Sequence, residues 1–174
     1  MAYKRKVLVV ANRTAASDEL LEALRARAQE GPIAYTLVVP PTTAGAAARE
    51  AAEAQLEAAL KRAAESGLEL TGRLGPPDPL DAVAAVWDPR AFDEVIVSTL
   101  PGQTSKWMLM DLPHRVARFT GVLVTHVVGS DERVKPVVDT VAPREKRGVL
   151  SPLTVLSWGG KAPVSGRGSE DEPA

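Results

Sequence analysis

Cysteine is absent from this chain of 174 residues. Its absence excludes disulfide bonds, zinc sites with cysteine ligands and thiol catalysis. Histidine is scarce as well, since His114 and His126 are the only two, and their separation in the sequence suggests no cluster of metal ligands. We therefore predict that the chain has no metal site.

The chain also lacks an excess of charge of either sign. Its 21 lysines and arginines are balanced by 22 acidic residues, which gives a formal net charge of -1. Without a global basic field, nucleic acid and anionic membrane surfaces are not expected partners. The apolar run at residues 7–11 is too short for the core of a signal peptide or for a membrane span. We expect a soluble, cytoplasmic protein.

Familiar motifs of catalysis and nucleotide binding are missing too. The sequence contains no Gly-x-Gly-x-x-Gly after a predicted strand, no Walker A spacing and no Gly-x-Ser-x-Gly. We therefore predict no catalytic residue, and a non-enzymatic role is the stronger hypothesis.

What the chain does contain is a regular alternation of strands and helices. Aliphatic and β-branched runs predict five strands, at about residues 7–11, 33–39, 68–74, 94–98 and 122–128. Helical patterns separate them, at about residues 17–30, 43–66, 78–87 and 107–119. This order predicts an α/β fold in which a five-stranded, parallel, Rossmann-like sheet carries helices on both faces. In the first helix, Leu20 and Leu24 should face the sheet while Arg25 and Arg27 face water.

A polar loop at residues 98–105 follows the fourth predicted strand. Because open parallel sheets bind ligands at the carboxyl ends of their strands, this loop is the expected mouth of a site. One interpretation is a cradle for a small anionic or polar ligand, helped by Arg13 at the end of the first strand; the loop and the following residue supply Ser98, Thr99, Gln103, Thr104, Ser105 and Lys106. The other interpretation is structural, because such hydroxyl groups also satisfy their own backbone and cap helices.

Three stretches of the chain resemble the universal stress protein family. They are residues 6–14 (KVLVVANRT), residues 75–83 and residues 94–128, and the resemblance covers roughly residues 4–128. It implies the family's five-stranded Rossmann-like layer, of the adenine nucleotide alpha hydrolase-like kind, and dimerisation, commonly through the last strand. It also implies a binding site in the cleft at the ends of strands one and four, to which Asn12 and Val39 would contribute.

Members of that family that bind ATP carry two glycines three residues apart, then a third glycine after nine residues, followed by Ser or Thr. On this sequence the same spacing falls on Ser98, Pro101, Asp111 and Leu112. Pro101 has no N–H to donate to a phosphate, Asp111 would bring a carboxylate beside one, and Leu112 has no hydroxyl group. Asn12 stands where the family has a nucleotide-binding Asp, and can still bind a ribose. The resemblance therefore implies weak or absent ATP binding, with ATP or another adenine nucleotide as the alternative.

Asp111 has a simpler structural interpretation. It would cap a helix that has Pro113 in its first turn and Leu112, Val116 and Phe119 facing inward. On this interpretation His114 lies on the exposed face of the helix.

The composition changes after the last predicted strand. We expect an α/β domain at residues 1–128 and a Pro- and Gly-rich extension at 129–174, with 162–174 disordered. The apolar segment at 149–158 could itself carry an interaction with a partner. As the terminal strand, residues 122–128 would expose an unpaired edge, which predicts a homodimer through that strand.

Overall fold

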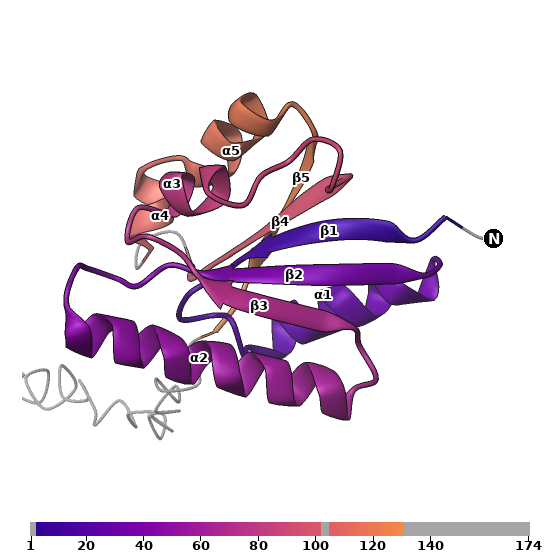
Figure 1. Cartoon of the computed structure of the whole chain (residues 1–174), viewed down its shortest axis with the longest axis horizontal. Helices are drawn as coiled ribbons and strands as arrows, with labels where there is room; N and C mark the ends of the chain where they lie inside the picture. The colour runs from indigo at the N-terminus through magenta and orange to yellow at the C-terminus, as the bar shows by residue number, and fades with distance from the viewer. Residues whose placement is uncertain (1–2, 102–104, 131–174) are drawn as a thin grey trace, which may run out of the picture. The chain divides into compact units, whose positions relative to one another are not determined.

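The computed structural model describes residues 3–101 and 105–130. These residues form a sheet of five strands, all parallel, in the order β3-β2-β1-β4-β5 (Figure 1). The strands are β1 (Arg5–Val10), β2 (Ile33–Val39), β3 (Leu70–Leu74), β4 (Glu94–Thr99) and β5 (Leu123–Val128). The prediction of a five-stranded parallel sheet is confirmed, and the strand order reverses direction between β1 and β4.

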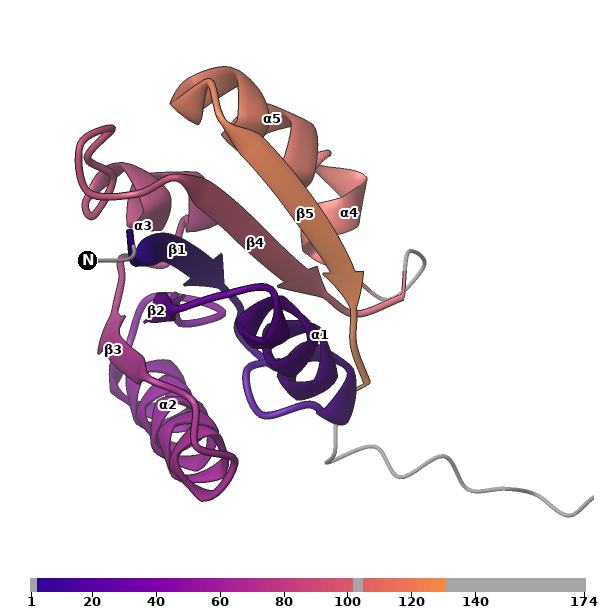
Figure 2. The same ribbon diagram turned by 90° about the vertical axis from the view of Figure 1, so that its right-hand side faces the viewer.

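Helices cover both faces of the sheet, as Figures 1 and 2 show. On one face, α1 (Asp18–Gln29) and α2 (Ala46–Glu65) pack over one hydrophobic cluster. On the other, α3 (Pro79–Ala84) and α5 (Leu112–Thr120) pack over a second cluster, and the short α4 (Lys106–Leu109) precedes α5. The molecule is therefore a doubly wound α/β layer.

The central strand β1 shows why the sheet is so apolar. Val7 and Val9 belong to one cluster and Leu8 and Val10 to the other, and none of the four is more than 1% exposed. A strand buried on both faces needs an unbroken aliphatic run, because successive side chains point to opposite faces.

The helix ends also follow the sequence signals. Ser17 caps α1 by accepting a hydrogen bond from the Leu20 amide, and Asp78 caps α3 in the same way. Gly121 ends α5 in the left-handed conformation at φ 70°. Alanines 52, 59 and 63 of α2 are buried, and this stripe lets the helix approach β3 so closely that a Cβ on Gly72 would lie 2.4 Å from Leu56 Cδ1.

The prediction of one continuous helix over residues 107–119 is wrong. α4 ends at Leu109, and Asp111 takes the left-handed conformation at φ 52° before α5 begins. The physical reason is Pro113, which has no N–H to donate to the Leu109 carbonyl and whose ring would clash with it. The break also corrects the predicted inward face: Leu112 and Val116 are fully buried, but Phe119 is 49% exposed.

The helical pattern predicted that Arg27 faces water, and this prediction is wrong. Its guanidinium reaches from α1 to Glu94 at the start of β4, with Nη2 2.7 Å from Oε1 and Nη1 3.1 Å from Oε2. Thr125 of β5 joins this pair, accepting from Arg27 and donating to Glu94. Because the Glu94 side chain is only 6% exposed, the contact is a largely buried ion pair.

Residues 131–174 lie outside the described part of the chain, and the predictions for the extension, its disordered end and its apolar segment lie there with them. Among the helices that the structure describes, none combines the length and the apolar character that crossing a membrane requires.

Candidate functional site

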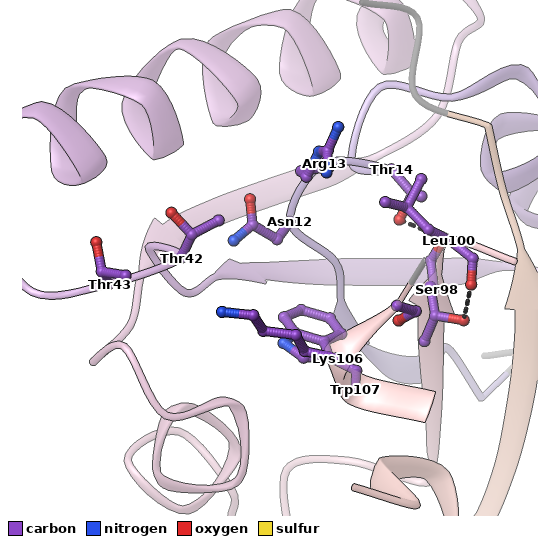
Figure 3. Close-up of a pocket in the computed structure, with 11 residues that line it drawn as sticks. Asn12, Arg13, Thr14, Thr42, Thr43, Ser98, Leu100, Lys106 and Trp107 are labelled. Atoms are coloured by element: carbon purple, nitrogen blue, oxygen red, sulfur yellow. Dashed lines mark hydrogen bonds between the residues drawn. The ribbon is translucent and has the colours of Figure 1, made fainter. Parts of the chain in front are cut away.

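A cavity of about 350 Å³ opens where β1 and β4 end, at the point where the strand order reverses (Figure 3). This is the position at which open parallel sheets bind ligands, and the volume lies at the small end of ligand pockets. Four segments line it: residues 12–14 after β1, 42–43 after β2, 98–100 at the end of β4, and 105–107 at the start of α4.

The cavity has a positive character. Arg13 and Lys106 both line it, and no acidic side chain is among its described lining residues. In Figure 3, Asn12, Arg13 and Thr42 lie along one side, with Lys106 and Trp107 opposite. Six further lining residues carry a hydroxyl group: Thr14, Thr42, Thr43, Ser98, Thr99 and Ser105. Such a wall suits a ligand with negative charge and several hydrogen-bonding groups.

Asn12 ties two walls of the cavity together. Its amide nitrogen donates a hydrogen bond of 2.5 Å to the Pro40 carbonyl, which joins the exits of β1 and β2. That bond uses one of the two amide hydrogens, so Asn12 can offer a ligand its amide oxygen as an acceptor and its second amide hydrogen as a donor. A ligand donor such as a ribose hydroxyl or an amino group suits this position.

Thr99 links the cavity to β5. Its hydroxyl donates to the Leu100 carbonyl at 3.0 Å and lies 2.8 Å from Nε2 of His126. The direction of the hydrogen bond between Thr99 and His126 depends on the tautomer of the imidazole. Burial lowers the pKa of His126 below its ordinary value, which favours the neutral imidazole at neutral pH.

The structure brings together most of the predicted site. Asn12, Arg13, Ser98, Thr99, Ser105 and Lys106 all line the cavity. Val39 does not: it is 0% exposed and packs in the core. Gln103 and Thr104 lie outside the described residues. Part of the structural interpretation also holds, because Ser105 caps α4 by accepting from the Met108 amide at 3.4 Å.

The cavity is also lined by residues outside the predicted site, namely Thr14, Thr42, Thr43, Leu100 and Trp107. Thr42 and Thr43 could have been found, because they follow β2 and the carboxyl ends of parallel strands meet at one edge of a sheet. Trp107 packs against the second core cluster and lines the cavity as well.

Two of the motif positions lie away from the cavity. Leu112 is 0% exposed and packs between α5 and the sheet. Asp111 is exposed, and its carboxylate lies 2.6 Å from Nδ1 of His114, whose side chain is 82% exposed. Asp111 and Leu112 match the spacing of the family's motif but do not lie at the cavity. The chain changes direction at the break at Asp111.

The fold and the position of the cavity define a class: doubly wound α/β domains with a site at the switch point of the sheet. Among solved structures, the chain is similar to a universal stress protein from Archaeoglobus fulgidus, with a TM-score of 0.53 and 15% identity over 71% of this chain and 93% of that one. It is also similar to a universal stress protein solved in complex with cAMP, with a TM-score of 0.51 and 21% identity over 74% of this chain and 100% of that one. The chain thus has the fold of universal stress proteins. Neither a family model nor a curated protein sequence matches it.

Proposed function

We propose that this domain is a non-enzymatic, stress-response or regulatory module of the universal stress protein kind, whose cavity binds a small anionic ligand and binds ATP weakly or not at all. The observation that carries the proposal is the pair of cations, Arg13 and Lys106, on a cavity whose described lining residues include no carboxylate. A cavity with this charge favours anions over cations and neutral molecules.

We expect weak ATP binding because of the residues next to the cavity. Pro101, which directly follows the lining residue Leu100, has no N–H to offer a phosphate. A triphosphate is usually held by a series of backbone donors and a metal ion. Two cations and several hydroxyl groups can hold one anionic group, whereas a chain of phosphates needs further backbone donors and a metal ion.

Sulfate should protect the chain against thermal unfolding, and replacing Arg13 and Lys106 together with Ala should abolish that protection. A ligand at about 100 times its dissociation constant adds about 2.7 kcal/mol to the stability of the folded state, which a melting curve resolves. The matched control is Lys61→Ala with Arg90→Ala, which removes the same charge from two exposed positions outside the cavity. An equal sulfate-induced shift in both double variants would contradict the proposal.

The second candidate is an adenine nucleotide with a single phosphate group. Trp107 and Leu100 offer an apolar wall on which a base could pack, and the amide oxygen of Asn12 can accept a hydrogen bond from it. The neighbour solved with cAMP supports this candidate, because cAMP carries one phosphate charge and not a chain of three. Titration with AMP, cAMP and inorganic phosphate separates the candidates, since only the second predicts that the base adds affinity.

We further propose a homodimer that pairs the β5 strands of two chains. β5 ends the sheet, and its outer edge has no partner strand within the described residues. Leu123 at its start is 66% exposed and Val128 at its end is 50% exposed. An apolar, unpaired edge is a template for pairing with another strand.

Light scattering on the full chain should report the mass of a dimer. Leu123→Lys with Val128→Lys should shift it to the monomer, because charged side chains discourage pairing at an edge. Leu109→Lys is the control, since Leu109 is 78% exposed and lies in α4 and not on the strand. A monomeric wild-type chain, or a dimer unchanged by the edge variant, contradicts this assembly.

A further inference from the structure

A buried hydrogen bond joins the two strands between which the cavity opens. The hydroxyl of Ser98, on β4, donates to the hydroxyl of Thr14 at 2.8 Å, and both residues are only 1% exposed (Figure 3). Thr14 follows β1, so the bond spans the switch point of the sheet. Both side chains line the cavity. We call this contact the Ser98–Thr14 bridge.

Neighbouring contacts hold the bridge in place. The Thr14 carbonyl accepts from the Ser17 amide at 3.1 Å, at the start of α1. On the other side Gly129 packs so closely that a Cβ there would lie 3.1 Å from Thr14 Cβ. Gly129 is itself fixed, because its amide donates to the Thr99 carbonyl at 2.9 Å. Thr14 therefore cannot swing aside without moving the end of β5.

We infer that the Ser98–Thr14 bridge sets the ligand class of the proposed site, by closing the inner end of the switch-point crevice to a chain of phosphates. The crevice between the ends of β1 and β4 is the place where ligands of such sheets bind. Here two buried side chains occupy it. A ligand is then held farther out, toward Arg13 and Lys106, the two cations that line the cavity.

This inference rests on the proposed function and makes a separate claim about it. The proposed function requires that the cavity binds an anion. The inference requires that the length of the anion is selected by the bridge. Inorganic phosphates test both without any contribution from a base or sugar, so orthophosphate and tripolyphosphate are the probes.

Calorimetric titration should show that the wild-type chain binds tripolyphosphate no more tightly than orthophosphate, although tripolyphosphate carries the larger charge. Ser98→Gly removes the bridging side chain, and should raise the affinity for tripolyphosphate by about tenfold relative to the affinity for orthophosphate. Thr14→Ala opens the same space from the other strand and should act in the same direction. Thr14→Ser keeps the hydroxyl group and should retain the wild-type selectivity.

Thr36→Gly controls for loosening of the sheet, because it places a glycine in β2 at a position that does not line the cavity. If both Ser98→Gly and Thr14→Ala leave the ratio of the two affinities unchanged, the inference is overturned while anion binding stands. If the wild-type chain binds neither phosphate but Ser98→Gly binds tripolyphosphate, the proposed function fails and the bridge is supported. If no variant binds either probe, both are overturned.

Discussion

Glu94→Ala should destabilise the fold more than any other single removal of a charge in the described part of the chain. The Glu94 carboxylate is almost fully buried and holds both the guanidinium of Arg27 and the hydroxyl of Thr125. Its removal leaves Arg27, which is 24% exposed, without its closest partner in a poorly solvated position. Removing one member of a buried ion pair costs about 3–5 kcal/mol, and the partial exposure of Arg27 places the expected loss near 3 kcal/mol.

Urea unfolding monitored by circular dichroism measures this loss. Arg27→Met combined with Glu94→Leu should cost much less than Glu94→Ala, because replacing both charges with apolar groups leaves no charge unpaired. Glu53→Ala is the surface control: it breaks the exposed pair with Arg49 and should cost about 0.5 kcal/mol or less. A loss for Glu94→Ala as small as that of the surface control would show that the pair does not join α1 to the sheet.

Leu112→Ser is the second change with a large expected effect. If Leu112 stood in a phosphate site, a hydroxyl group there would strengthen nucleotide binding. In the structure the side chain is 0% exposed and fills the core beneath α5. Truncating a buried leucine leaves a cavity and costs about 2.7–5 kcal/mol, and an unpaired hydroxyl group adds to that cost.

Leu109→Ser makes the same chemical change at a position that is 78% exposed. It should alter the unfolding free energy by about 0.5 kcal/mol or less, as surface substitutions usually do. Neither variant should gain affinity for ATP. If Leu112→Ser bound ATP more tightly and lost no stability, residue 112 would belong to the nucleotide site after all.

The sheet could be predicted because each strand has a recognisable pattern within its own few residues. A run such as residues 7–11 has no polar side chain, and its short length and β-branched residues are typical of a strand buried on both faces. The caps at Ser17 and Asp78 and the stop at Gly121 are equally local signals. Because the predicted strands are parallel, the loops that follow them were expected at one edge of the sheet.

The features that the sequence did not predict depend on contacts between distant residues. Arg27 belongs to the polar side of its helical pattern, and only the tertiary structure brings Glu94 close to it, 67 residues away. The Ser98–Thr14 bridge likewise joins residues 84 positions apart. Asp111 and Leu112 were placed by spacing alone, which cannot account for a left-handed residue that redirects the chain.

We propose that the cavity holds a small anion and not ATP. Calorimetric titration of the wild-type chain with ATP and magnesium to low millimolar concentration, beside a titration with inorganic phosphate, tests this directly. We expect saturable binding of phosphate, and a dissociation constant for ATP in the millimolar range or no measurable heat. A micromolar dissociation constant for ATP, which corresponds to about 8.2 kcal/mol of binding free energy, would contradict it.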